Sequence, residues 1–119
     1  MSALFDKQVK FTLMVSKLIQ MAEYMGYKVT LGDAYRDPRV FGALGVKMGY
    51  GNANSCHKSR LAIDLNLFKD GVFLTTTEGH KPLGEWWELE GGTWGGRFKD
   101  SKGNPTQDGN HYSLDEGSK

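Results

Sequence analysis

The sequence is short of several features that mark large classes of protein. Its 119 residues include one cysteine, Cys56, so no disulfide can form within the chain, and a fold without one is compatible with a reducing cytoplasm. Fifteen Lys and Arg residues against fourteen Asp and Glu give a net charge of +1. Because binding to a phosphate backbone normally needs a strongly basic face, we expect no nucleic-acid partner.

Long hydrophobic runs are also absent. Across residues 4–25 the apolar side chains are interrupted by polar and charged ones, namely Asp6, Lys7, Lys10, Lys17, Gln20 and Glu23. These interruptions argue against a secretion signal and against a membrane span. We therefore expect no membrane insertion, and a substrate outside the cytoplasm would be reached only with help.

What remains is the composition of one folded domain. The chain is 39% hydrophobic and 12% aromatic, which is enough to fill one core at this length. We expect residues 1–119 to form a single domain, with no room for a separate targeting or wall-binding module.

The first half of the chain predicts one long helix. Apolar residues recur at steps of three and four across residues 4–25, as in an amphipathic helix, and Gly26 ends the pattern. Val29 and Leu31 indicate a short strand, and residues 33–38 a turn before proline. Residues 42–56 are too rich in glycine for a regular element and are expected to form a loop near a site.

The second half predicts short strands and a second helix. Residues 61–68 alternate between two faces as in a strand, and Asp70-Gly71 favours a hairpin turn before residues 72–74. A shorter helix is expected after Pro82, ending at Gly91-Gly92, with Trp86 and Trp87 in the core. Residues 99–109 are expected to form a mobile polar loop, followed by a strand at 111–114. The prediction is an α+β fold: a small antiparallel sheet flanked by one long N-terminal helix and one shorter helix.

Three side chains could meet to form a zinc site carried by this small antiparallel sheet. Asp64 lies on the opposite face of its strand from Ile63 and Leu65, and a carboxylate buried there would need a cation or several donors. His57 precedes it and His111 follows the polar loop. Two imidazoles and one carboxylate leave a fourth position of Zn²⁺ open to water, as in catalytic zinc sites. Spacing alone leaves other interpretations open: either histidine could be a surface or core residue, Asp64 a solvent-facing strand residue, and Asp108-Gly109 a simple turn.

Four motifs in order along residues 35–112 resemble one family of zinc peptidases. Ser55-Cys56-His57-Lys58-Ser59-Arg60-Leu61-Ala62-Ile63-Asp64 is similar to the Ser-x-His-x-x-Gly-x-Ala-x-Asp motif of D-alanyl-D-alanine carboxypeptidases, vancomycin-resistance D,D-dipeptidases and phage L-alanyl-D-glutamate endopeptidases, which share the Hedgehog/D,D-peptidase fold. Asp108-x-x-His111 resembles the second half of that site. Tyr35-Arg36 resembles the family's Tyr-Arg, and Trp94-Gly95-Gly96-Arg97-Phe98 resembles the Trp-Gly-Gly stretch of the endolysin branch.

The sequence departs from the family pattern at Arg60, where the motif usually has glycine, so the shape of that loop is expected to differ. Cys56 adjoins a predicted ligand but faces the other way in an extended segment, and we interpret it as a buried, inert thiol. His80 falls in no family motif and is not expected to bind the metal.

The resemblance assigns a role to each site residue. It implies that His57, Asp64 and His111 hold Zn²⁺, that Asp108 is the general base, and that Arg36 donates to the developing oxyanion. Arg36 could instead form a salt bridge with Asp33 or Asp37. Ser55 is implied to support the ligand loop or to contact substrate.

The resemblance also implies a substrate, the stem peptide of peptidoglycan, cut most plausibly at the L-Ala–D-Glu bond. A phage or prophage endolysin of this kind, a monomer, would stay in the host cytoplasm until a holin releases it to the cell wall in the periplasm. Two alternatives are a D,D-carboxypeptidase or dipeptidase of cell-wall metabolism and a non-catalytic zinc or wall-binding module.

Overall fold

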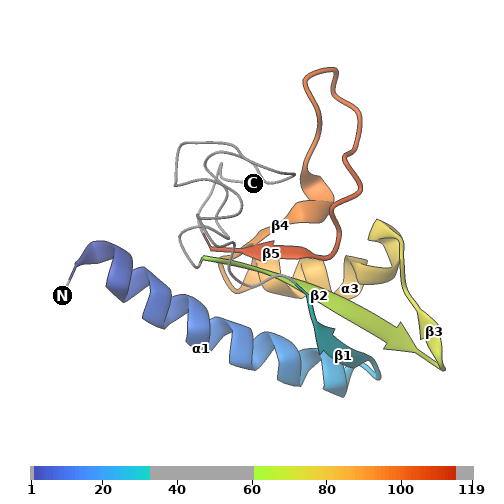
Figure 1. Ribbon diagram of the computed structural model, residues 1–119, viewed down its shortest axis with the longest axis horizontal. Helices are drawn as coiled ribbons and strands as arrows, with labels where there is room; N and C mark the ends of the chain where they lie inside the picture. The colour runs from blue at the N-terminus through green and yellow to red at the C-terminus, as the bar shows by residue number, and fades with distance from the viewer. Residues whose placement is uncertain (1, 33–60, 115–119) are drawn as a thin grey trace.

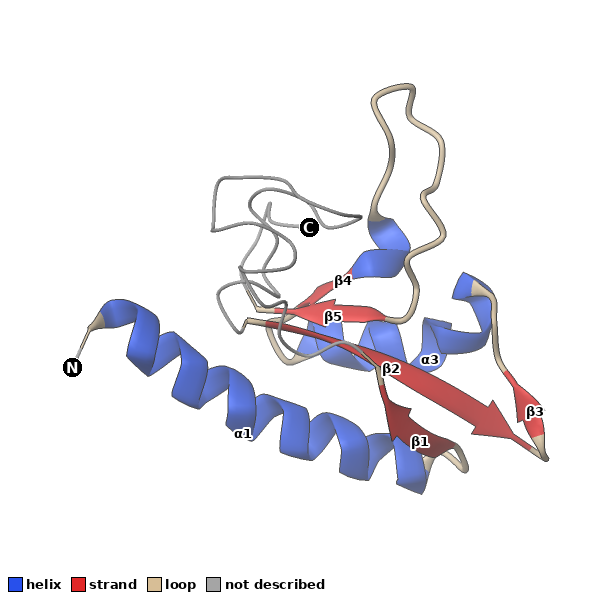
Figure 2. Cartoon of the chain, in the orientation of Figure 1, coloured by secondary structure: helices blue, strands red, loops and turns tan. Residues whose placement is uncertain are grey.

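The computed structural model describes residues 2–32 and 61–114. They form two helices, five short strands and one 3₁₀ helix (Figure 1, Figure 2). In chain order these are α1 (Ala3–Tyr24), β1 (Lys28–Leu31), β2 (Ala62–Lys69), β3 (Val72–Phe73), α3 (Thr77–Leu89), β4 (Thr93–Trp94), η1 (Gly95–Arg97) and β5 (His111–Ser113). The predicted α+β class, with a small antiparallel sheet and two helices, is confirmed.

The sheet is built around β2. Its strands follow the order β1-β2-β5-β4, every pair is antiparallel, and β3 pairs with the end of β2. Both helices pack on the same face of the sheet: the ring of Phe11 on α1 meets Trp87 on α3 edge to face at 6.1 Å, and Trp87 meets Tyr112 of β5 in the same way. The opposite face of β2 therefore carries the side chains that alternate with the core, including Asp64.

Helix α1 agrees with the predicted helix to within one residue at each end. The Ser2 side chain accepts a hydrogen bond from the Phe5 N–H and caps the first turn. Phe11, Leu18 and Ala22 are buried at helical spacing. The chain leaves the helix through Gly26, whose φ of +94° belongs to the left-handed region that glycine adopts freely.

Strand β2 and its hairpin also match the prediction. Leu61, Ile63, Leu65 and Leu67 are buried, as their alternation requires. Asp70 and Gly71 both have positive φ, 53° and 80°, which is the conformation of a two-residue hairpin turn. Strand β3 itself is shorter than expected, and the next residue, Leu74, donates its N–H to the Leu67 carbonyl.

The predicted start of the second helix is wrong. Helix α3 begins at Thr77, so Pro82 lies inside it and does not precede it. The reason is the cap: the Thr76 hydroxyl accepts a hydrogen bond from the Gly79 N–H, and this cap starts the helix a full turn before the proline. The predicted core position of Trp87 is confirmed, since its side chain is fully buried, and Trp86 is partly buried against the core.

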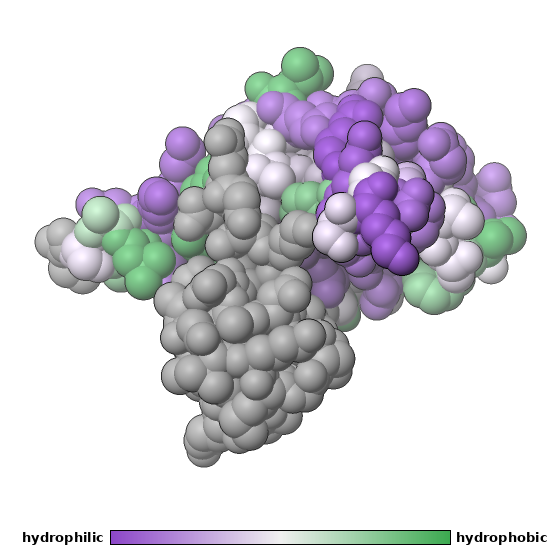
Figure 3. Space-filling view, turned by 90° about the horizontal axis from the view of Figure 1, so that it is seen from above, coloured by the Kyte–Doolittle hydropathy of each residue, from purple (hydrophilic) through white to green (hydrophobic). Residues whose placement is uncertain are grey.

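The polar segment 99–109 has more local structure than a plain loop. The Asp100 carboxylate accepts hydrogen bonds from the N–H groups of Lys102 and Asn104, and Lys99 bridges Pro105 across the loop. The loop projects from the sheet in Figure 1, and Figure 3 shows that this side of the molecule is largely hydrophilic, with apolar groups in separate patches. The predicted strand that follows is present as β5, whereas β4 and η1 were not predicted.

Two predicted segments, the turn at 33–38 and the glycine-rich loop at 42–56, lie outside the described residues. In the part of the chain that the structure describes, neither helix has the length and apolarity needed to cross a membrane.

Candidate functional site

Two of the predicted metal ligands face each other across the sheet. Asp64 of β2 is the direct register partner of His111 of β5. The neighbouring residues make the hydrogen bond, from the Leu65 N–H to the Asn110 carbonyl at 2.9 Å, so Asp64 and His111 form a non-hydrogen-bonded pair. Side chains approach most closely at such pairs.

The geometry of this pair fits a divalent metal ion. The Asp64 Oδ1 and His111 Nδ1 atoms are 3.5 Å apart, and the two side chains are only 18% and 8% exposed. Two ligand atoms of a tetrahedral zinc, each about 2.0–2.2 Å from the metal, are themselves separated by roughly 3.4 Å. A carboxylate and an imidazole are also ligands that zinc accepts, so the donor set and its spacing agree.

The chain before His111 is held by the Trp94-Gly95 segment. The Trp94 indole N–H donates to the Gly109 carbonyl at 2.7 Å. Gly95 lies against the same turn: a Cβ added there would collide with the Asp108 carbonyl oxygen and come within 2.7 Å of the His111 Cβ. Only a residue without a side chain allows this approach, so the glycine after the tryptophan lets η1 pack directly behind the site.

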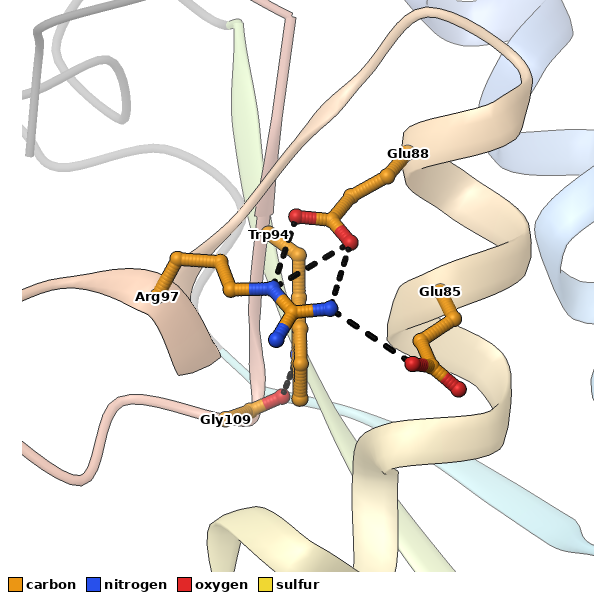
Figure 4. A network of polar contacts seen from close by, with 5 residues as sticks. All are labelled: Glu85, Glu88, Trp94, Arg97 and Gly109. Atoms are coloured by element: carbon orange, nitrogen blue, oxygen red, sulfur yellow. Dashed lines mark hydrogen bonds and ion pairs between the residues drawn. The ribbon is translucent and has the colours of Figure 1, made fainter.

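Trp94 is fixed in turn by a cluster of charges on its outer side (Figure 4). The Arg97 guanidinium lies over the Trp94 ring, 5.1 Å from the centroid. Its Nη2 is 3.0 Å from Glu88 Oε1 and 3.6 Å from Glu85 Oε2, both on α3. The hydrogen bond to Glu88 raises the pKa of Arg97, and the charges of Glu88 and Glu85 act in the same direction. Because Arg97 and Glu85 are about half exposed and Glu88 about one third, these ion pairs add little to the stability of the fold.

Asp108, the predicted base, lies on the turn that leads into β5. Its backbone carbonyl accepts a hydrogen bond from the His111 N–H at 3.0 Å, and its carboxylate accepts one from the Thr106 hydroxyl at 2.8 Å. The side chain is exposed. The turn therefore joins the predicted base to a predicted ligand through one backbone hydrogen bond.

His80 lies on the other side of the sheet. It is a buried residue of α3, and its Nδ1 lies 2.8 Å from the hydroxyl of Tyr112. Tyr112 follows His111 on β5, but its side chain is in the core and faces the helices. Burial lowers the pKa of His80 to about 4 and raises the pKa of Tyr112, to which the charge of Tyr27 adds. His80 is thus a neutral core residue in contact with Tyr112.

The remaining predicted site residues, Arg36, Ser55 and His57, lie outside the described residues, as does Cys56. Within residues 2–32 and 61–114, no three His, Cys, Asp or Glu side chains are close enough to hold a metal ion together. The described structure therefore provides two of the three predicted ligands, Asp64 and His111, as a pair.

In the sequence, the Trp94-Gly95-Gly96 stretch is only a resemblance to the endolysin branch and has no assigned role. Its contacts with Gly109, Asp108 and His111 show that it packs against the turn that leads into the candidate site. The available signal was the pair of glycines after a tryptophan, which indicates close backbone packing but does not name its partner.

The comparison with protein families defines the class. Residues 49–114 match the model of the family described as D-alanyl-D-alanine carboxypeptidase. The matched span contains Ser55, His57, Asp64, Asp108 and His111, and Arg36 precedes it.

The chain therefore belongs to the D-alanyl-D-alanine carboxypeptidase family of peptidases, which act on the bacterial cell wall and are generally zinc-dependent. No curated protein matches it.

Proposed function

We propose that this protein is a zinc peptidase that hydrolyses the L-Ala–D-Glu bond of peptidoglycan stem peptides, with residues 1–119 as a single peptidase domain. The observation that carries the proposal is the pairing of Asp64 with His111, 3.5 Å apart within the span that matches the family. The turn that begins at Asp108 leads directly into that pair.

The metal would be held by His57, Asp64 and His111. Zinc bound by two imidazoles and a carboxylate supplies a water of lowered pKa and a Lewis acid for the scissile carbonyl. The register of β2 and β5, which brings the Asp64 and His111 side chains together on the face of the sheet opposite the helices, supports this ligand set.

Asp108 would accept a proton from the attacking water and deliver it to the leaving amine. Its carboxylate is exposed to solvent and is oriented by the Thr106 hydroxyl, which leaves its other oxygen for this transfer. Arg36 would donate to the carbonyl oxygen as negative charge develops, and Ser55 would support the ligand loop or contact the peptide.

The biological setting follows from the endolysin resemblance of the Trp94-Gly95-Gly96 stretch. We place the protein, as a monomer, in the host cytoplasm until a holin allows it to reach the cell wall from the periplasmic side. Its partner is the stem peptide, with no nucleic acid and no membrane insertion.

A second candidate is removal of the terminal D-alanine, because the matched family is described as D-alanyl-D-alanine carboxypeptidase. A non-catalytic zinc module is the third. Asp108 separates the third from the others, since a protein that only binds the wall has no need of a base beside the metal.

Digestion of purified peptidoglycan, followed by mass spectrometry of the new termini, tests the proposal. We expect fragments that begin with D-glutamate. Release of free D-alanine would establish the carboxypeptidase activity instead. If zinc-loaded protein produced no new terminus, the non-catalytic zinc module would be the remaining candidate.

A further inference from the structure

A cavity of about 260 Å³ lies beside the Asp64–His111 pair. On the edge of β2 away from β1, β5 pairs with residues 62–64 and β3 with residues 68–69, so an interval remains between these two strands. The cavity occupies that interval. Leu65 and Asn66, which follow Asp64, line one side, and Gly109 and Asn110, which precede His111, line another.

The remaining walls come from the connection between β3 and α3 and from the first turns of α3 (Figure 1). A larger hollow of about 450 Å³ lies between α1 and α3, with Asp6, Lys17 and Trp86 among its lining. Of these two cavities, the smaller one is bounded by the direct chain neighbours of Asp64 and His111, and its lining residue Asn66 lies on the same face of β2 as Asp64.

The described lining of this cavity is uncharged and combines polar with apolar side chains. It offers hydroxyl and amide groups from Asn66, Thr75, Thr76, Thr77, Gln107 and Asn110. His80 also reaches it and is neutral at pH 7, because burial lowers its pKa to about 4. A charged group placed here would lose water without gaining a counter-ion from these walls, which costs several kcal/mol, whereas an amide or hydroxyl would be matched.

The wall on the Asp108 side is held in a defined conformation. Gln107 has a φ of +62°, in the left-handed region that side chains other than glycine seldom adopt and that is enriched at functional sites. Gly109 lies so close to α3 that a Cβ there would come within 2.5 Å of the Thr77 Cα. The turn before His111 is therefore packed against the helix, and the cavity is part of the folded structure around the site.

We propose that this cavity binds the uncharged side of the scissile bond, an L-alanine acylated at its nitrogen. The inference rests on the proposed cleavage between L-alanine and D-glutamate. Of the two halves of that substrate, the glutamate half carries a carboxylate and the acylated alanine half carries only amides and methyl groups. Leu65, Phe73 and Leu74 provide apolar contacts for the methyl groups. The volume is slightly below that of pockets for drug-sized ligands, about 300–1,000 Å³, and suits one residue with its acyl group.

Two soluble peptides test this assignment. Both contain the L-Ala–D-Glu bond, and they differ only in an acetylated or a free amino terminus. The wild-type protein is expected to cleave the acetylated peptide with a kcat/KM at least about tenfold higher, because the ammonium of the other would enter an uncharged cavity.

The exposed Thr75, at the edge of the cavity, provides a matched pair of variants. Thr75→Glu adds one negative charge and Thr75→Gln adds the same bulk without charge. Thr75→Glu is expected to shift the ratio of kcat/KM values toward the free-amine peptide by about tenfold, mostly through KM, and less at high salt. Thr75→Gln is expected to affect both peptides alike, and Ser101→Glu, in the projecting loop, should leave both rates unchanged.

The outcomes separate the cavity from the proposed function. Equal ratios for Thr75→Glu and Thr75→Gln, with wild-type protein active on either peptide, would overturn the cavity assignment alone. Failure of zinc-loaded wild-type protein to cleave either peptide would overturn the proposed function and the cavity assignment that depends on it.

Discussion

Adjacent residues of β5 carry opposite kinds of chemistry. The side chain of His111 faces Asp64 on the face of the sheet opposite α1 and α3, whereas that of Tyr112 faces the helices and meets His80. The alternation of a strand produces this division, because successive side chains point to opposite faces. Of the two described histidines, His111 thus pairs with Asp64, the arrangement that the proposed metal site uses, and His80 packs in the core, although both are largely buried.

The proposed base can be tested apart from the metal. Asp108→Ala is expected to retain zinc and to lose wall-lysing activity by at least about a hundredfold, the usual range for general-base catalysis. Zinc content by elemental analysis and lysis of purified walls are the two measurements. Wild-type lysis in this variant would reject the assigned role, and loss of zinc would show that Asp108 is a ligand.

The burial of His80 predicts a dependence of stability on pH. Since the pKa of His80 falls from 6.5 to about 4 on folding, the unfolded chain takes up the proton first as the pH drops. As the pH falls from about 6.5 to 4, the titration of His80 should therefore lower the free energy of unfolding by roughly 3 kcal/mol. Above about pH 6.5, His80 should not change the free energy of unfolding.

His80→Asn is the matched variant, because the Asn amide can donate a hydrogen bond to the Tyr112 hydroxyl or accept one from it but does not titrate. Denaturant unfolding of both proteins from pH 4 to pH 8 measures the difference. Parallel pH profiles for the two proteins would contradict the prediction.

At the scale of elements, the turn before β5 is held by contacts from β4 and η1 on one side and α3 on the other. Trp94 reaches the Gly109 carbonyl, while Trp87 makes an equivalent indole hydrogen bond to the Ser113 carbonyl in the core. The two tryptophans are both buried, so replacing either by phenylalanine removes one buried donor of the same kind.

Comparing variants of these two tryptophans separates an effect on zinc binding from an effect on the stability of the fold. Trp94→Phe and Trp87→Phe should each lower the free energy of unfolding by about 1–3 kcal/mol. Only Trp94→Phe is expected to weaken zinc binding by about tenfold or more, as for other residues that orient metal ligands, measured by competition with a chelator. The same loss of zinc affinity in Trp87→Phe would mean that Trp94 acts through stability alone.

The elements that the sequence predicted are those whose signals are local. The periodicity of α1, the alternation of β2 and the Asp70-Gly71 turn each depend on neighbours within a few residues. The start of α3 was missed because two rules competed, proline at the first turn and a threonine cap, and the cap of Thr76 prevailed. Strand β4 and η1 were missed because two and three residues are too few to show a period.

At the scale of the whole molecule, a bound metal should stabilise the fold. Its proposed ligands Asp64 and His111 join two strands, so zinc binds the folded state and not the open chain. Zinc at about 100 times its Kd adds roughly 2.7 kcal/mol, or about 10 °C in Tm for a domain of this size.

Calorimetry of chelator-treated protein with and without added zinc measures this shift. Asp64→Asn, His111→Ala and His57→Ala should abolish it, whereas Asp70→Asn, in the hairpin turn at the end of β2, should retain it. An undiminished shift in all three ligand variants would place the zinc elsewhere.

By itself the sequence determined the class of fold, its longest helix and strand, and the residue types at the candidate site, because propensity, periodicity and motif chemistry are written in neighbouring residues. The tertiary structure decided that Asp64 lies opposite His111, that Trp94 and Gly95 support the turn between Asp108 and His111, and that an uncharged cavity lies beside them. These depend on the register of strands far apart in the chain, and register is set by the packing of the whole core against α1 and α3.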